Sequence, residues 1–207
     1  MKKRLFDLIS ANIAIILLSP LFLTIMLIVR KDGGPAIYKQ RRVGKDGRLF
    51  TFYKFRSMVL NADKMGAQVT ATHDPRITRI GHFLRKTKLD ELPQLVNVIA
   101  GDISVVGPRP EVPVYVDKWP KGQKEIVLSV KPGITDYATL VYNDEQAVLS
   151  RSDNPEKTYL EAVMPHKLSL YQRYIDDQSF LLDIKIIFGT LLKMFGFEDR
   201  FVGRLVS

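Results

Sequence analysis

The chain has 207 residues, of which 46% are hydrophobic, so it is long enough for one domain with a modest core and too apolar for a disordered chain. It has no cysteine, which excludes disulfides and thiolate metal sites, and its three scattered histidines, His73, His82 and His166, do not predict a zinc site. The net charge of +9 favours anionic partners such as nucleic acid, acidic lipid headgroups or phosphorylated substrates.

The first predicted element is a hydrophobic segment, Ile13 to Val29, which carries no charge and has basic residues on both sides. A cleavable signal peptide has a similar layout, but no small-residue cleavage site follows, since the chain continues with Arg30 and Lys31. As a helix, the segment would span roughly 26 Å, which is marginal for a hydrocarbon core of about 30 Å. A simple spanning helix is therefore one interpretation among others.

Ser19 and Pro20 divide this segment, and a proline inside a helix removes a backbone donor and kinks it. Positive charges at both ends also disfavour a span, because a spanning helix prefers them on one side. We therefore expect residues 1–31 to form a re-entrant membrane helix hairpin with its hinge at Ser19 and Pro20. Ser19 would then hydrogen-bond a carbonyl group freed by the kink. A kinked spanning helix remains the alternative.

The next segments predict a small β-hairpin followed by short helices. Residues 36–40 and 49–55 have extended patterns, and the Gly-Lys-Asp-Gly sequence at 44–47 is a turn signal between them. Residues 61–68 predict a short helix. Residues 75–88 are basic, with apolar side chains at helical spacing.

Four further elements are predicted in the second half of the chain. A helix begins near Asp90, with Pro93 in its first turn, and ends near Gly101. Residues 104–110 predict a rigid loop, and residues 121–129 a short helix. Asn154 and Pro155 begin a longer helix with cap and proline in the expected order, and its predicted buried face comprises Tyr159, Leu160, Val163, Leu168, Tyr171 and Ile175.

The last predicted helix starts near Ser179 and is rich in apolar residues. Lysines at 185 and 193 interrupt this pattern, and further apolar residues follow at Phe197, Phe201 and Val202. Such a tail can pack on the core or lie in a membrane interface.

Asp90 and Glu91 are adjacent carboxylates at a predicted helix start. The ordinary explanation is that acidic residues interact favourably with the helix dipole at this end. Their basic surroundings favour a chemical role, because Arg85 lies shortly upstream among further basic residues. Carboxylates beside a phosphate-binding cluster can hold Mg²⁺, or one of them can attack phosphorus.

Two more basic groups are candidate phosphate ligands. Arg109 lies between Pro108 and Pro110, which restrict the backbone around it, and an arginine held in this way suits bidentate phosphate recognition. Lys54 and Arg56 lie at the end of the strand predicted at 49–55, although a solvated strand end explains them equally well. The chain has no Walker loop and no GxGxxG fingerprint, which argues against an ATPase or a dinucleotide enzyme.

Four motifs together resemble the bacterial sugar transferase family, the monotopic phosphoglycosyl transferases that initiate glycoconjugate assembly. They occur in the family's order over nearly the whole chain, which also has the Ser-Pro-broken hydrophobic N-terminus, and its length resembles the minimal catalytic form. The motifs are KFRSM at 54–58, LDELPQ at 89–94, GDISVVGPRP at 101–110 and KPGIT at 131–135.

The resemblance implies a mostly helical α+β fold with a re-entrant hairpin at 1–31. Residues 32–207 would be a cytoplasmic catalytic domain with amphipathic interfacial helices around a compact core. Asp90 matches the aspartate that attacks the β-phosphate of a UDP-sugar, releasing UMP and leaving a phosphosugar-aspartyl intermediate. Polyprenyl (undecaprenyl) phosphate then takes up the phosphosugar. Glu91 matches the partner glutamate of this dyad, and Arg85 matches a phosphate-binding arginine.

Further expectations follow from the same resemblance. Pro108, Arg109 and Pro110 match a nucleotide-binding loop, and Mg²⁺ is the implied cofactor, with Asp90 as its ligand. The implied location is the cytoplasmic face of the bacterial inner membrane, in contact with anionic lipid and without nucleic acid. A homodimer and downstream glycosyltransferases are compatible partners, in the assembly of capsule, lipopolysaccharide O-antigen, exopolysaccharide or glycoprotein.

The chain departs from the family pattern after Thr135. Many members continue with Gly-Trp/Leu-Ala-Gln-Val-Asn-Gly-Arg, whereas this chain reads DYATLVYNDE at 136–145, which leaves the sugar open. Two other interpretations compete with the enzyme. A membrane-anchored nucleic-acid binder would use the basic charge and the aromatic residues but leaves Asp90 and Glu91 unexplained. A non-catalytic membrane scaffold predicts that Asp90 can be replaced without consequence.

Overall fold

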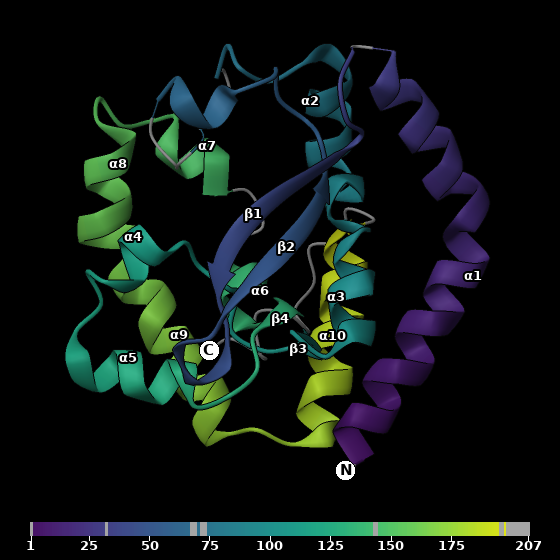
Figure 1. Cartoon of the computed structure of the whole chain (residues 1–207). Coiled ribbons are helices and arrows are strands. Elements are labelled where there is room, and N and C mark those ends of the chain that lie inside the picture. Colours follow the sequence, from purple (N-terminus) through teal and green to yellow (C-terminus); the bar gives the residue numbers. More distant parts are fainter. Residues whose placement is uncertain are drawn as a thin grey trace.

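The computed structural model describes residues 2–31, 33–66, 70, 74–142, 145–194 and 197. A long N-terminal helix runs along one side of a mostly helical domain, and a β-hairpin crosses the middle (Figure 1). The elements of the first half are α1 (Lys2–Arg30), β1 (Ile37–Val43), η1 (Lys45–Gly47), β2 (Leu49–Phe55), η2 (Ala62–Lys64), α2 (Arg79–Lys86), η3 (Leu89–Glu91), α3 (Gln94–Ala100) and β3 (Ser104–Val106).

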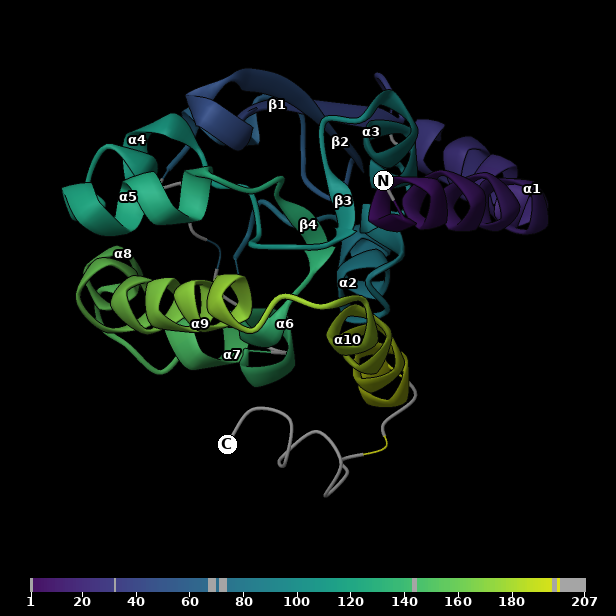
Figure 2. The ribbon, with the colours of Figure 1, turned by 90° about the horizontal axis from the view of Figure 1, so that it is seen from below.

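The second half is built mainly from helices. α4, α5, α8 and α9 lie on the side of the domain away from α1, and α10 lies on the same side as α1 (Figure 2). The elements are α4 (Pro113–Val116), α5 (Lys121–Leu128), β4 (Gly133–Thr135), α6 (Tyr137–Val141), α7 (Glu145–Leu149), α8 (Pro155–Thr158), a π-helical turn η4 (Tyr159–Val163), α9 (Met164–Asp176) and α10 (Phe180–Met194).

α1 is one continuous helix, which corrects the expectation of a two-helix hairpin at 1–31. Pro20 leaves the carbonyl of Ile16, four residues earlier, without its usual backbone donor. The Ser19 hydroxyl donates to that same carbonyl at 2.8 Å, so the predicted side-chain bond is confirmed. The substitute donor explains how helical backbone continues through the proline.

Both ends of α1 are attached to the same domain. Near its start, Lys3 pairs with Asp183 of α10 at 2.5 Å, and Asp7 accepts from the hydroxyl of Ser104 at 2.9 and 3.0 Å. In its last turn, the carbonyl of Val29 accepts from Arg56 at 2.7 Å. Between these contacts α1 is largely exposed, and it is the single helix of the described part long and apolar enough to cross a membrane. Its exposed side chains include Leu5, Ile9, Ile13, Ile16, Leu17, Leu23 and Leu27.

The predicted β-hairpin is confirmed. β1 and β2 pair antiparallel from Ile37 opposite Phe55 to Val43 opposite Leu49. The turn needs left-handed backbone, which Asp46 (φ 56°) and Gly47 (φ 76°) supply. β2 buries Phe50, Phe52 and Phe55 and turns Lys54 toward the candidate site.

Within the described residues, the short 3-10 turn η2 replaces the helix expected at 61–68, and Asn61 before it is left-handed (φ 60°); residues 67 and 68 lie outside the described part. The helix expected within 75–88 forms as α2. It begins only at Arg79 because Thr78 caps it by accepting from Gly81 N at 3.0 Å. Before that cap, Ile77 forms an isolated β-bridge with Met58.

The segment expected to be a rigid loop at 104–110 contains strand β3, which pairs in parallel with β4. The two backbones come very close at Gly107 and Gly133. A Cβ on Gly107 would lie 2.5 Å from the carbonyl oxygen of Lys131, and one on Gly133 would lie 2.1 Å from Gly107 N. Only glycine fits at either position, so this pairing fixes where the following Pro-Arg-Pro sequence begins.

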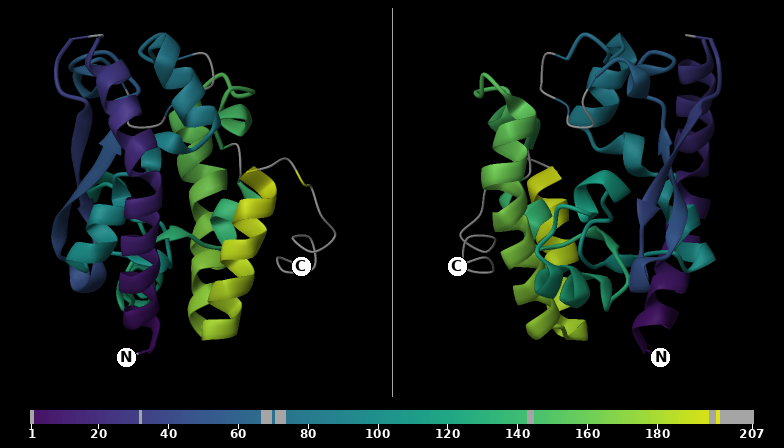
Figure 3. Two further views of the ribbon diagram at one scale, coloured as in Figure 1. Left: turned by 90° about the vertical axis from the view of Figure 1, so that its right-hand side faces the viewer. Right: turned by 60° about the vertical axis from the view of Figure 1, so that its left-hand side comes forward.

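The predicted helices at 121–129, from Asn154 and from Ser179 are confirmed as α5, as α8 to α9, and as α10. The predicted buried face of the longer helix packs into the largest core cluster, which α4, α5, α6 and α10 complete. α6 contacts both α9 and α10, and Figure 3 shows these helices from two further sides. α10 also keeps an exposed apolar face of Phe180, Leu181, Ile184, Phe188, Leu191 and Met194. Phe201 and Val202 lie outside the described residues.

Candidate active site

A sharp turn brings Arg85 and the two acidic residues to the same place. α2 ends at Lys86, and Lys88 adopts left-handed backbone (φ 58°), which reverses the chain into η3. Asp90 and Glu91 then lie in the first turn of a helical path that continues into α3, and Asp90 is 6% exposed. The helix start expected near Asp90 is therefore present, as a 3-10 turn.

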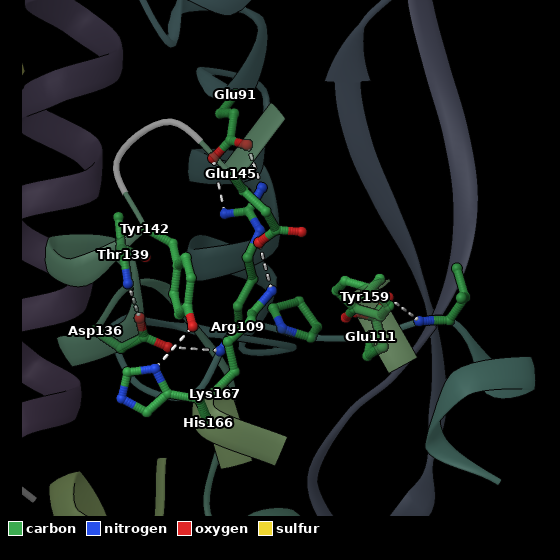
Figure 4. A network of polar contacts seen from close by, with 12 residues as sticks. Glu91, Arg109, Glu111, Asp136, Thr139, Tyr142, Glu145, Tyr159, His166 and Lys167 are labelled. Carbon is green, nitrogen blue, oxygen red and sulfur yellow. Dashed lines mark hydrogen bonds and ion pairs between the residues drawn. The ribbon is translucent and has the colours of Figure 1, made fainter. Parts of the chain in front are cut away.

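Glu91 is held by two cations. Arg109 contacts both of its carboxylate oxygens, with Nη1 at 3.0 Å from Oε2 and Nη2 on Oε1, and Lys54 Nζ lies 3.0 Å from Oε1 (Figure 4 shows the Arg109 pair). Burial alone would raise the pKa of Glu91, but Arg109 and Lys54 outweigh it and hold that pKa well below its usual range. Glu91 is therefore a negative charge that orders the basic groups around it.

Asp90 has a different environment. Within the residues that the structure describes, its carboxylate forms no hydrogen bond or ion pair. Burial raises the pKa of Asp90; Lys54 opposes this effect, and the adjacent Glu91 adds to it. A buried carboxylate without a direct partner is poised to take a cation or a substrate group.

The main chain of Arg109 is fixed by a residue that sequence reasoning missed. Asp136 accepts from Arg109 N at 3.0 Å through Oδ2, and its Oδ1 caps α6 by accepting from Thr139 N at 2.7 Å (Figure 4). The flanking prolines take part through their carbonyl groups: Pro108 accepts from Gly133 N at 2.9 Å, and Pro110 accepts from Arg42 at 3.1 Å. The predicted Pro-Arg-Pro loop is thus anchored on both sides.

Arg85 approaches the acidic pair from α2. Burial lowers the pKa of its guanidinium, and the negative charge of Asp90 acts in the opposite direction, which places the two groups within electrostatic range. With the Gln146 amide oriented so that its oxygen faces Arg85, this oxygen accepts from Nη2 at 2.6 Å and from Nε at 2.8 Å. Gln146 on α7 is a second residue that the sequence did not single out.

Arg56 is not part of this cluster, although it was grouped with Lys54 as a candidate phosphate ligand. Its side chain is buried and donates to the carbonyl of Val29, at the end of α1. The separation follows from strand geometry, because Lys54 still lies in β2 whereas Arg56 follows the strand's last residue. Arg56 therefore connects α1 to the rest of the domain.

A second buried polar network adjoins the first. Glu111 pairs with Arg42 at 2.6 Å and accepts from the hydroxyl of Tyr159, and Lys167 pairs with Glu145 at 2.9 Å (Figure 4). Burial would raise the pKa of Glu111, but Arg42 and Lys167 hold it below its usual value. The only sequence signal for Glu111 is its position directly after Pro110.

The side chains at the site meet the requirements of the expected Mg²⁺ ion in part. The described residues contain no group of three metal-ligating side chains, and the oxygens of Glu91 are taken by Arg109 and Lys54. That leaves Asp90 as a single carboxylate ligand, which suits Mg²⁺, since this ion is commonly bound by one or two carboxylates together with substrate phosphates. Among the histidines, His166 pairs with the Tyr142 hydroxyl at 2.7 Å and His82 is exposed, while His73 lies outside the described residues.

Comparison with known proteins gives a consistent set of similarities. Residues 1–197 match the family model described as "Bacterial sugar transferase". The chain is 42% identical over 168 residues to the "Undecaprenyl-phosphate galactose phosphotransferase" of Salmonella typhimurium, covering 69% of this chain and 35% of that protein. It is 38% identical over 197 residues to the "UDP-glucose:undecaprenyl-phosphate glucose-1-phosphate transferase" of Escherichia coli, covering 93% and 40%.

A third similarity extends over nearly the full length of both chains. The "Exopolysaccharide production protein PSS" of Rhizobium leguminosarum is 36% identical over 199 residues, covering 92% of this chain and 93% of that protein. The chain therefore spans only 35% to 40% of the Salmonella and Escherichia coli relatives but nearly all of the Rhizobium one.

Proposed function

Because the chain belongs to the bacterial sugar transferase family, we propose that it transfers a sugar phosphate from a UDP-sugar to undecaprenyl phosphate and releases UMP. The observation that carries this proposal is Asp90, a buried carboxylate without a direct partner among the described residues, beside a cluster of Lys54, Arg85 and Arg109. The names of the Salmonella and Escherichia coli relatives support the same reaction class, with galactose in one and glucose in the other. The sugar used by this chain is therefore a separate question.

The reaction runs in two displacements at one phosphorus atom. A carboxylate oxygen of Asp90 attacks the β-phosphorus, an oxygen–phosphorus bond forms, and UMP leaves with the electron pair of the broken phosphoanhydride bond. An oxygen of undecaprenyl phosphate then attacks the same phosphorus, and the Asp90 carboxylate leaves. Each step exchanges one oxygen–phosphorus bond for another, so no oxidant or further reactant is needed.

The basic residues explain how a carboxylate approaches a polyanion. A diphosphate repels Asp90, and positive groups placed around it reduce that repulsion and stabilise the charge that develops on the leaving UMP. Arg85 and Arg109 lie on opposite elements, α2 and the loop after β3, so they can contact the diphosphate from two sides. Glu91 holds Arg109 and Lys54 in place and remains ionised, which leaves the attack to Asp90.

Asp90 is also the residue that would hold Mg²⁺ together with phosphate oxygens of the substrate. When bound there, the ion would neutralise phosphate charge and support the leaving group. A buried carboxylate that is not engaged by Arg109 or Lys54 is the donor with capacity for this role.

The membrane placement of α1 follows from its two attachments. Lys3 and Asp7 contact the domain at one end, and Val29 does so at the other. A spanning helix would carry one end across about 30 Å of hydrocarbon and break these contacts. We therefore propose that α1 is monotopic, with both ends at the same membrane face and the exposed apolar side chains of its middle in one leaflet.

The basic residues at both ends of α1 favour the cytoplasmic face of the inner membrane, where anionic headgroups lie. The exposed apolar face of α10 would then lie in the same interface, because Phe180 at its start stacks edge-on against Phe6 of α1 at 5.4 Å. This arrangement brings the active site to the level at which undecaprenyl phosphate presents its phosphate group.

A transfer assay tests the proposed function. The protein in detergent or vesicles, with undecaprenyl phosphate and Mg²⁺, is given a panel of UDP-sugars, and released nucleotide is identified by chromatography. We expect UMP from at least one sugar nucleotide and none from Asp90→Asn, while Asp117→Asn, at an exposed surface pair, keeps full activity. Release of UDP in place of UMP, or full activity of Asp90→Asn, would contradict the proposal.

A further inference from the structure

The helical path that carries Asp90 buries three polar side chains in one stripe. Leu92 (φ −51°, ψ −37°) and Pro93 (φ −61°, ψ −15°) keep right-handed helical backbone between η3 and α3. Asp90, Gln94 and Asn97 therefore follow one another at four- and three-residue spacing on a single face. Gln94 and Asn97 are both fully buried, and Asp90 is nearly so.

The amide of Asn97 is fully used by the fold. Its oxygen accepts from Tyr53 N at 3.2 Å, and its nitrogen donates to the carbonyl of Thr51 at 2.7 Å and to Asp102 at 3.0 Å. These bonds attach α3 to β2, the strand that carries Lys54. Asn97 is therefore a structural amide, because both of its polar atoms bond to other parts of the fold.

The amide of Gln94 is different, because neither Nε2 nor Oε1 has a hydrogen-bond partner among the described residues although the side chain is 0% exposed. An unpaired buried polar group is destabilising, and native proteins retain few of them. About one helical turn away lies Asp90, whose carboxylate also forms no hydrogen bond within the described part of the chain. One residue offers an unused donor and the other an unused acceptor.

We propose that Gln94 is a positioning residue for Asp90, and that its Nε2 donates a hydrogen bond to one carboxylate oxygen when substrate occupies the site. The other oxygen is then directed at the β-phosphorus. Gln94 is fully buried whereas Asp90 is 6% exposed, so a substrate that arrives from solvent can contact Asp90 but not Gln94. This inference rests on the proposed function, because it assigns a role within the same displacement.

Two variants separate positioning from a structural role. Gln94→Met keeps the length of the side chain and removes both unpaired polar atoms, so Tm should equal or exceed that of the wild type. Gln94→Asn keeps the amide but leaves a gap of one methylene, so Tm should fall. Under our proposal kcat follows another order, with wild type highest, Asn intermediate and Met lowest.

We expect Gln94→Met to lose about 10-fold or more in kcat for UMP release, with KM for the UDP-sugar nearly unchanged, since the lost bond goes to the nucleophile. Asn97→Leu serves as the matched control, an amide of the same stripe, and should lower Tm because it breaks three bonds to neighbouring segments.

Wild-type kcat in Gln94→Met with an unchanged or raised Tm would overturn the positioning role alone. Activity that simply follows Tm across the variants would do the same. Failure of the wild-type protein to release UMP from any UDP-sugar would overturn the proposed function, and the role of Gln94 with it. The two failures are therefore distinguishable in one series of measurements.

Discussion

Asp90 and Glu91 are adjacent in the chain, yet their carboxylates have different electrostatic environments. Arg109 and Lys54 keep Glu91 paired and hold its pKa low, whereas burial raises the pKa of Asp90. Pairs of acidic groups whose surroundings separate their pKa values take separate roles in many active sites. At the scale of single residues, this asymmetry supports the proposal that Asp90 attacks phosphorus while Glu91 orders the basic groups.

The bidentate contact between Arg109 and Glu91 leads to a prediction about Arg109→Lys. Lysine is a single point charge and cannot reproduce the planar fork that contacts both oxygens of Glu91. We expect kcat/KM for the UDP-sugar to fall about tenfold or more, measured by steady-state UMP release. The matched control is Arg56→Lys, because Arg56 contacts the Val29 carbonyl rather than the acidic pair, and its kcat/KM should change little. Equal losses in both variants would contradict this placement.

Glu111 gives a prediction about pH and stability. Burial raises its pKa, but Arg42, Lys167 and the Tyr159 hydroxyl together lower it below the unfolded value. A lowered pKa contributes stability that is present above the unfolded pKa of about 4.3 and is lost as pH falls through the folded pKa. The Tm difference between wild type and Glu111→Gln should therefore be largest at neutral pH and shrink below about pH 4. A constant difference across that range would mean that the ionised form of Glu111 contributes no stability.

Sequence could identify some site residues and not others, for physical reasons. Asp90, Arg85 and Arg109 could be identified because Asp90 and Arg109 lie in contiguous motifs with unusual charge or proline content and Arg85 lies in the basic segment at 75–88. Asp136 and Gln146 were not, because their roles depend on contacts with residues far along the chain. Arg56 has a different partner from Lys54 because it follows the last residue of β2, whereas Lys54 lies within the strand.

At the scale of elements, local sequence signals predicted helices and the hairpin, but they did not predict the pairing between segments distant in the chain. The hairpin of β1 and β2 follows from its extended segments and a Gly-containing turn, α2 follows from apolar residues at helical spacing, and α3 and the helix from Asn154 follow from proline and cap signals. β3 and β4 have three residues each and pair in parallel over a long sequence separation. A local sequence pattern does not predict such a pairing. The sequence shows Gly107 and Gly133 only as glycines in two separate motifs, and it does not predict that their backbones lie close together.

α1 supplies the prediction at this scale. Because both of its ends contact the domain, single cysteines at Lys2 and Lys31 should both resist a membrane-impermeant thiol reagent in intact cells. The chain has no cysteine of its own, so each label reports one position. Both sites should react once the membrane is permeabilised. Labelling of Lys2→Cys alone in intact cells would establish a spanning helix.

At the scale of the whole molecule, the apolar and polar features occupy different regions. The exposed apolar surfaces of α1 and α10 lie on one side of the domain, away from α4, α5, α8 and α9 (Figure 2). The charged site lies between η3, the end of β2 and the loop that follows β3. Under the proposed function, the lipid-linked acceptor would reach Asp90 from the membrane side and the nucleotide sugar would reach it from the solvent side.

The central claim is that Asp90 becomes covalently attached to the phosphosugar, and a single-turnover experiment tests it most directly. Wild-type protein is mixed with a UDP-sugar that it uses and Mg²⁺, without undecaprenyl phosphate; UMP is followed in time, and the acid-quenched protein is examined by peptide mass spectrometry. The account predicts a burst of up to one equivalent of UMP, a phosphosugar on Asp90, and neither in Asp90→Asn. UMP that appears only when both substrates are present, with no modified peptide, would contradict it and indicate direct transfer in a ternary complex.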